Sequence, residues 1–337
     1  MRINNIMLYQ HNKSKNLSFN AGQTTLITDF DFTFSPKAFD DNYRPIYIKS
    51  YKEIAEPYFK KFSDLQKKLK DSFKIFISTG RKQGAGYHEC ESIFDNFEIL
   101  KEENRPKIDG VIENNGETFF NVENHNGKII LNEDKQKNEK RNIVREQLKE
   151  KKTGQEVAKD LDVVISLKEA KENNDLVIVS GDGTNDRSFL NIYSYIELPK
   201  GTKIPQTAKE SESLLASMPD IKKQISDLPV KIIIMEGDCS KEEYYKYLVK
   251  TFPNKYKTGK QAIRIGEAPL FDNIETSIEE YTQSNKKYAD ALKNKRKKNT
   301  DINKLLKIFI PIFITICVLS FGIGFLIYNK EKNKKKP

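Results

Sequence analysis

Three short apolar runs in this chain each end in a cluster of polar residues, and this repeated pattern constrains the fold more than any other feature. The polar clusters are "DFDFT" (29–33), "STGR" (78–81) and "GDGTND" (181–186). Short apolar runs of this kind are typical of strands that are buried on both faces of a parallel sheet. Since the carboxyl ends of such strands meet along one edge, the pattern predicts a binding crevice where the three clusters converge.

Helix signals separate the apolar runs. Ser50 and Glu53 form a capping box that predicts a helix to about Asp71, and a second capping box at Thr153 predicts a helix to about Asn173. Strands that alternate with helices predict an α/β fold with a doubly wound, mainly parallel sheet that is covered on both faces.

Other segments predict further elements of the same kind. "IENNGETFF" (112–120) predicts two strands joined by an Asn-Gly turn, and 134–150 predicts a charged helix. "PVKIIIMEGD" (229–238) predicts a strand, and its Gly-Asp lacks a later aspartate, which favours a helix-capping loop over a second site. We also expect strands at "SYIEL" (194–198) and "QAIRIG" (261–266).

The first polar cluster places two carboxylates in one small volume. Asp29 and Asp31 are two residues apart, so in an extended segment their side chains point the same way. This is costly unless a cation or a reaction compensates the charge, although an exposed turn or a helix N-cap would also explain the pair. With Asp182 and Asp186 in the same crevice, the carboxylates would form an oxygen site suited to Mg²⁺. Thr79 adds donors for an anion, and the combination describes phosphoryl transfer.

In their order along the chain, these motifs resemble those of the haloacid dehalogenase superfamily of phosphohydrolases. "IENNGETFF" is similar to a segment of the Cof-type and sucrose-phosphate-phosphatase-like members, and the resemblance covers about residues 24–200. It implies a Mg²⁺-dependent phosphatase that hydrolyses a phosphate monoester through an aspartyl-phosphate intermediate. Asp29 would be the nucleophile, and Asp31 would be the general acid and then the general base.

The resemblance also implies the ligands of the metal and of the phosphate. Asp29, Asp182 and Asp186 would hold Mg²⁺ together with Asp31, which would contribute its backbone carbonyl. The substrate phosphate would be bound at Thr79 and Gly80, and by the lysine of the third motif.

The third-motif lysine is open to three assignments. Lys152 precedes the helix that leads to the fourth motif, and we favour it as the catalytic and phosphate-binding lysine; Lys151 and Lys159 are the alternatives. A second departure is Phe32, which stands where the family usually has glycine; this bears on the shape of the entrance more than on the chemistry. Third, the cap that such proteins carry looks reduced, to roughly 117–150.

Two rivals share these motifs. One is a phosphomutase or phosphotransferase of the same fold, and the other is a catalytically silent, membrane-tethered binding protein. The reduced cap favours hydrolysis, because it leaves the site open to water. The substrate would be a small phosphorylated molecule. The sequence specifies neither its identity nor the oligomeric state of the protein.

The C-terminal region differs in composition from the rest of the chain. Residues 308–328 contain no charged side chain, and as a helix they would be about 31 Å long, enough to cross a bilayer core. We therefore expect a phosphatase domain over 1–283, a basic linker over 284–304, a transmembrane helix over 305–329 and a basic tail over 330–337.

The distribution of charge and cysteine bears on partners and location. The net charge is +10, but residues 284–337 contain 14 of the 58 Lys and Arg residues and three of the 48 acids, so the remainder is nearly neutral. This disfavours nucleic acid and favours anionic lipid next to the apolar segment. The basic residues that flank the apolar segment also predict a single-pass C-terminal anchor with the catalytic domain in the cytoplasm. Three widely spaced cysteines agree with a reducing compartment and argue against a disulfide scaffold or a zinc site.

Overall fold

The chain divides into two units, residues 1–278 and 279–337, and the first carries the sheet. The computed structural model describes residues 22–36, 48–80, 83–84, 87–88, 94, 97–98, 100–114, 116–125, 128–151, 160–199 and 201–285.

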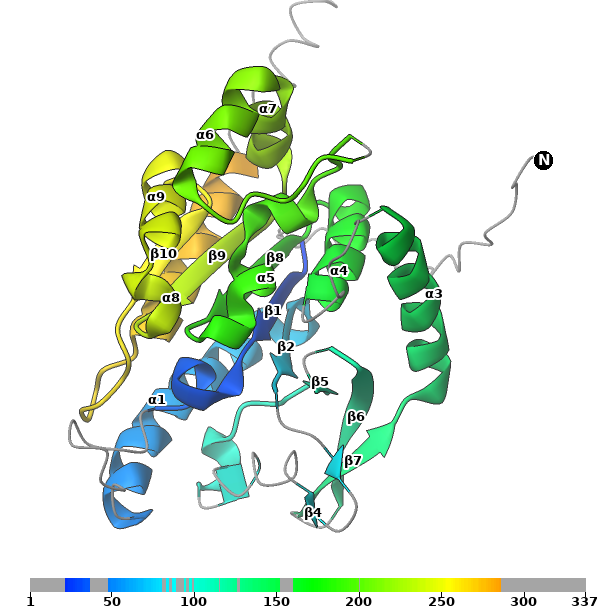
Figure 1. Cartoon of the computed structure of the whole chain (residues 1–337). Helices are drawn as coiled ribbons and strands as arrows, with labels where there is room; N and C mark the ends of the chain where they lie inside the picture. Colours follow the sequence, from blue (N-terminus) through cyan, green and yellow to red (C-terminus); the bar gives the residue numbers. More distant parts are fainter. Residues whose placement is uncertain are drawn as a thin grey trace, which may run out of the picture. The chain divides into compact units, whose positions relative to one another are not determined.

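Within these residues an eight-stranded sheet runs through the first unit, in the order β10-β9-β8-β1-β2-β5-β6-β7 (Figure 1). All neighbouring strands from β10 to β5 are parallel, whereas β6 and β7 are antiparallel additions at one end. A separate two-stranded pair is formed by β3 and β4. The strands are β1 (Thr24–Thr28), β2 (Phe73–Ser78), β3 (Gln83–Gly84), β4 (Tyr87–His88), β5 (Gly110–Glu113), β6 (Thr118–His125), β7 (Lys128–Glu133), β8 (Leu176–Gly181), β9 (Val230–Met235) and β10 (Tyr256–Gly259).

The strand order confirms the prediction of a doubly wound, mainly parallel sheet. From the central strand β1 the chain passes to β2 and β5 on one side, and it later returns to β8, β9 and β10 on the other. Leu26 is opposite Ile75 of β2 and Ile178 of β8, and every residue of β1 and β8 is buried. The direction of winding therefore reverses between β1 and β8, which is where ligands bind in sheets of this type.

Helices connect the strands and cover both faces of the sheet. In Figure 1, α1 runs behind the strands, and α4 and α5 lie in front of them. A further helix covers 269–285. The helical segments are η1 (Phe30–Phe34), α1 (Ile48–Leu69), η2 (Lys70–Ser72), η3 (Glu102–Asn104), α3 (Lys135–Lys151), α4 (Asp160–Asn173), η4 (Thr184–Asp186), α5 (Arg187–Leu190), η5 (Ile192–Tyr195), α6 (Ala208–Ser217), α7 (Asp220–Asp227), α8 (Asp238–Lys241) and α9 (Glu243–Thr251).

Successive residues of a strand point to opposite faces of the sheet, so each strand contributes side chains to two different cores. Ile27 and Val179 belong to a buried cluster that also contains Leu167 of α4. On α1, aromatic side chains pack around Phe34, whose ring centroid is 5.5 Å from that of Phe59 and 5.0 Å from that of Phe62. The aromatic cluster therefore fixes the turn after β1 against α1.

The antiparallel end of the sheet is tied to the rest by a buried ion pair. Residues 117–150, where a reduced cap is predicted, contain β6, β7 and most of α3, and β6 pairs directly with β5. Arg141 of α3 is 1% exposed and donates from Nε and Nη2 to the two carboxylate oxygens of Asp162 of α4, at 3.0 and 2.7 Å. It also donates to the carbonyl of Gly116 at 2.8 Å. The pair thus joins α3, α4 and the turn between β5 and β6.

Two predicted strands are wrong. Residues 194–198 are not a strand, because η5 occupies Ile192–Tyr195, where the Asn191 side chain accepts a hydrogen bond from the backbone N–H of Tyr193. Residues 261–266 form a turn in which Glu267 accepts from the backbone N–H groups of Ile263 and Arg264 at 3.0 and 3.1 Å. In both segments a side chain competes for backbone groups that a strand would need.

The predicted membrane anchor is also corrected. In the part of the chain that the structure describes, no helix combines the length and the apolar character needed to cross a bilayer. The apolar segment 308–328 lies outside the described residues. The transmembrane helix predicted over 305–329 is therefore not supported, and neither is the membrane-anchored localisation that depended on it.

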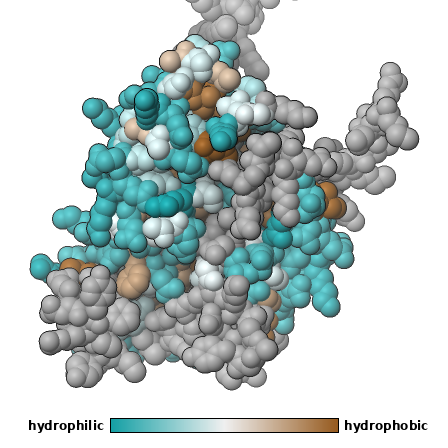
Figure 2. Space-filling model, in the orientation of Figure 1, coloured by the Kyte–Doolittle hydropathy of each residue, from teal (hydrophilic) through white to brown (hydrophobic). Residues whose placement is uncertain are grey.

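The described surface is mostly polar on the side shown in Figure 2, where apolar residues form small separate patches. The large apolar side chains that are most exposed include Ile143 of α3 and Ile265, at 61% and 66%. Isolated apolar side chains of this kind are ordinary on a protein surface.

We predict that Arg141→Met lowers the free energy of unfolding by about 3–5 kcal/mol, because it leaves the buried carboxylate of Asp162 without its partner. The double variant Arg141→Met/Asp162→Leu should recover most of this loss. Urea unfolding of the intact protein measures both effects. The control is Lys246→Met, which removes an exposed ion pair with Glu243 and should cost less than about 1 kcal/mol. Equal losses in the buried and exposed variants would contradict the prediction.

Candidate active site

The first site residue follows directly from the end of the central strand. Asp29 comes after β1, and its backbone N–H donates to the carbonyl of Ser180 in β8 at 2.9 Å. The Ser180 hydroxyl donates to the Thr28 hydroxyl at 2.7 Å, which in turn donates to the Asp29 carbonyl at 2.8 Å. The backbone of Asp29 is thus held from both sides, and its side chain is almost fully buried.

The end of β8 supplies two more carboxylates. Asp182 follows the strand, and Asp186 ends the short helix η4 after it. Oδ2 of Asp186 accepts hydrogen bonds from the backbone N–H groups of Asp182 and Gly183, both at 3.0 Å. The hydroxyl of Thr33 donates to Oδ1 of Asp182 at 3.0 Å. Thr33 of the first motif thus orients Asp182, and the backbone of the last motif orients Asp186, both at the same edge of the sheet.

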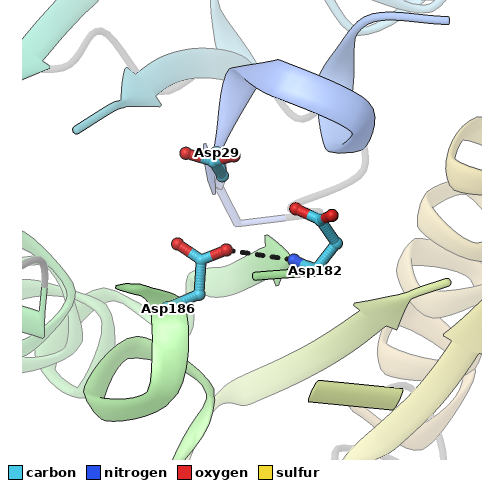
Figure 3. Close-up of side chains that lie close together, drawn as sticks. All are labelled: Asp29, Asp182 and Asp186. Atoms are coloured by element: carbon cyan, nitrogen blue, oxygen red, sulfur yellow. Dashed lines mark hydrogen bonds between the residues drawn. The ribbon is translucent and has the colours of Figure 1, made fainter. Parts of the chain in front are cut away.

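The three carboxylates Asp29, Asp182 and Asp186 converge on one point, as Figure 3 shows. Each contributes one oxygen atom, and these atoms all lie within 4.8 Å of one another. Asp29 and Asp186 are buried and Asp182 is half-buried, so water screens their repulsion only in part. Three hard oxygen donors without histidine or cysteine fit a divalent cation such as Mg²⁺.

A cavity of about 390 Å³ opens onto this cluster. Asp31 lines the cavity and is half-buried, but its carboxylate is not part of the three-carboxylate cluster. Thr79, which is 1% exposed, and Gly80 line the cavity from the end of β2, where the Thr79 N–H donates to the carbonyl of Ile112 at 2.9 Å. Among the described residues, the cavity is lined by Asp29, Asp31, Phe32, Thr79, Gly80, Asp182, Gly183 and Asn185.

The turn that carries the first motif has an unusual backbone. Phe32 has a φ of 58° and a ψ of 1°, in the left-handed region. For a residue with a Cβ this conformation costs roughly 1–2 kcal/mol. The turn closes because the Asp29 carbonyl accepts from the N–H of Phe34 at 3.2 Å and the Phe30 carbonyl accepts from the N–H of Ser35 at 2.9 Å. Phenylalanine thus occupies a position whose backbone suits glycine.

The loop after β9 supports the site, a role that its sequence did not indicate. The Cys239 N–H donates to the carbonyl of Asp182 at 3.0 Å, and its thiol lies 2.9 Å from the carbonyl oxygen of Gly183. Burial raises the pKa of the thiol to about 12, so Cys239 remains protonated and acts as a donor. The predicted helix-capping role of this loop is confirmed, because Ser240 accepts from the N–H of Gly237 at 3.1 Å at the start of α8.

Tyr51, in α1, is another residue near the site that the sequence analysis did not identify. Its side chain is 6% exposed, and its hydroxyl has no hydrogen-bond partner in the part of the chain that the structure describes. Burial and, secondarily, the negative charge of Asp31 raise the pKa of this hydroxyl. Tyr51 is therefore a neutral donor in the electrostatic field of Asp31. No sequence motif marks it.

The predicted lysine of the third motif cannot be located in the same way. Lys152 and Lys159 lie outside the described residues, and Lys151 is described only as the last residue of the α3 backbone. The assignment among these three lysines stays a prediction.

Comparisons with known proteins add little to this geometry. No family model matches the chain, and no curated protein matches it. Among solved structures, an N-terminally truncated IMP-nucleotidase of Plasmodium falciparum is similar to 79% of this chain over 72% of its own length, at 11% identity and a TM-score of 0.26. A likeness this distant does not identify a family. The fold and the site together define a doubly wound α/β protein with a cluster of carboxylates at its topological switch point.

We predict that Gly237→Ala weakens the binding of Mg²⁺ at the three-carboxylate cluster by about tenfold, the lower end of the effect of disturbing residues behind metal ligands. A Cβ at this position would lie 2.6 Å from both the carbonyl oxygen and Oδ2 of Asp182, so that carboxylate must move. Calorimetric titration with Mg²⁺ measures the affinity without any substrate. Glu236→Ala, an exposed neighbour, should leave the affinity unchanged. Equal affinities in the two variants would show that Gly237 does not position Asp182.

Proposed function

We propose that this chain is a Mg²⁺-dependent phosphatase that hydrolyses a phosphate monoester, and that it belongs to the haloacid dehalogenase superfamily that its motifs resemble. The observation that carries the proposal is the convergence of Asp29, Asp182 and Asp186 within 4.8 Å, at the edge of the sheet where Thr79 also lies. Three carboxylates close together need a cation, and the hydrogen-bond donors at Thr79 suit a phosphate. The site therefore fits a cation and a phosphate bound together.

In the proposed reaction, the Asp29 carboxylate attacks phosphorus, and the bond from phosphorus to the leaving oxygen breaks as the aspartyl-phosphate forms. Asp31 gives its proton to the leaving oxygen, and the half-buried position of its side chain at the cavity wall suits this exchange. Asp31 then accepts a proton from the water that attacks the aspartyl-phosphate, which releases phosphate and restores Asp29.

Asp29, Asp182 and Asp186 would hold the Mg²⁺ ion, with the Asp31 backbone carbonyl as a further donor. When bound, the ion would offset the negative charge of the carboxylates and of the phosphate. The hydrogen bonds from Thr33 to Asp182, and from the Asp182 and Gly183 N–H groups to Asp186, keep these two carboxylates in place before any ligand arrives. Thr79 and Gly80 would bind the phosphate.

We predict that Asp29→Asn abolishes Mg²⁺-dependent phosphate release, because an amide cannot act as the nucleophile. Asp31→Asn should lower turnover by about 10²–10⁴-fold, the usual contribution of general acid–base catalysis. Both variants should remain folded, since Asp29→Asn removes a negative charge from the carboxylate cluster and Asp31→Asn keeps the size of a half-buried side chain. Release of inorganic phosphate from a panel of phosphorylated metabolites measures the effect, and Asp220→Asn, on the exposed end of α7, is the matched control. Near-native turnover by Asp29→Asn would contradict the assignment of the nucleophile.

A further prediction concerns the metal. Activity should disappear in excess EDTA and return with Mg²⁺, whereas Ca²⁺ should inhibit, because its larger and more irregular coordination shell suits in-line transfer poorly. Mg²⁺ should also raise the midpoint of thermal unfolding of the intact protein, and Asp182→Asn should reduce that shift. Full activity in excess EDTA would show that the carboxylate cluster serves another purpose.

A further inference from the structure

We propose that the Phe32 side chain is a specificity-determining residue, and that it selects phosphate esters whose alcohol portion carries an aromatic ring. The inference rests on the proposed phosphatase function and adds to it the chemical class of the substrate. Its basis is the place of Phe32 in the lining of the cavity onto which the catalytic carboxylates open.

Phe32 differs from the phenylalanines on either side of it in the same turn. Phe30 and Phe34 are buried at 1% and 0% exposure, with ring centroids 6.1 and 6.3 Å from that of Phe97. Phe32 is only half-buried, and it lines the cavity next to Asp31 and Thr79. Two of the three rings therefore belong to the aromatic core, while the third residue is half-buried and lines the cavity.

The backbone at Phe32 makes this placement informative. A φ of 58° is unfavourable for a bulky side chain, and the same turn would form more readily with glycine or asparagine. Strained residues of this kind tend to lie at functional sites, where the side chain has a use that offsets the strain. The left-handed turn places Phe32 in the cavity lining, while Phe30 and Phe34 are buried in the core.

The cavity offers the two parts of the substrate different chemistry. Asp29, Asp182 and Asp186, with a cation, suit the phosphate, whereas the ring of Phe32 suits an apolar, planar group. Aromatic rings attract one another in offset or edge-to-face arrangements beyond the effect of burial alone. Among the residues that the structure describes, those that line the cavity include no other aromatic side chain, so the preference should depend on this position.

The test compares two esters whose leaving alcohols have similar acidity, 2-phenylethyl phosphate and ethyl phosphate. The intact protein should hydrolyse the aromatic ester with a kcat/KM about tenfold higher. Phe32→Asn, which tolerates the left-handed backbone but has no ring, should reduce this ratio to near one, and Phe32→Tyr should keep it. Ile143→Asn, an exposed position on α3, is the control and should leave the ratio as it is. A ratio in Phe32→Asn equal to that of the intact protein would overturn the inference.

A binding measurement separates this inference from the proposed function. In Asp29→Asn with Mg²⁺, 2-phenylethyl phosphate should bind about tenfold more tightly than ethyl phosphate, and adding Phe32→Asn should remove the difference. If the intact protein hydrolyses neither ester but shows this binding preference, the phosphatase function fails and the role of Phe32 stands. If it hydrolyses both esters equally well, or binds them equally, the role of Phe32 is refuted.

Discussion

Repulsion among carboxylates at the end of two adjacent strands is the constraint on which the site depends. Asp29 and Asp186 are buried, and both lie within 4.8 Å of Asp182, oxygen to oxygen. Such a cluster is stable only if hydrogen bonds or a cation offset the charge. The protein provides part of the compensation itself, through the donors of Thr33, Asp182 and Gly183. In the proposed function, a bound cation would offset the remainder of the charge.

The parallel pairing of β1 with β8 gives this constraint its geometry. Thr28 of β1 is opposite Ser180 of β8, and their hydroxyls are hydrogen-bonded at 2.7 Å one residue before the first carboxylate. In this register Asp29 is level with Gly181, and Asp182 follows one residue later at the same edge of the sheet. The loop after β9 then holds the second motif from behind, through the N–H of Cys239. The position of the carboxylates is therefore a property of three neighbouring strands and not of one loop.

The sequence predicted the parts of this arrangement that depend on local pattern. Apolar runs predicted β1, β2 and β8, and the polar residues after them identified Asp29, Asp182 and Thr79. Contacts between distant segments could not be predicted in this way. Tyr51 and Cys239 come near the site only because α1 and β9 pack beside it, and no local pattern records that packing. The two strand predictions that are wrong have another cause. The side chains of Asn191 and Glu267 accept hydrogen bonds from backbone N–H groups that a strand would need for its pairing.

The ion pair between Arg141 and Asp162 affects how the length of the connection between α3 and α4 bears on stability. It holds α3 against α4, so both ends of the connection between Lys151 and Asp160 are fixed by contacts outside that connection. The entropy of closing a loop grows only with the logarithm of its length, and doubling the number of residues costs about 0.6 kcal/mol. The length of this connection should therefore have little effect on the free energy of unfolding, because contacts elsewhere keep the ends of the strands in place.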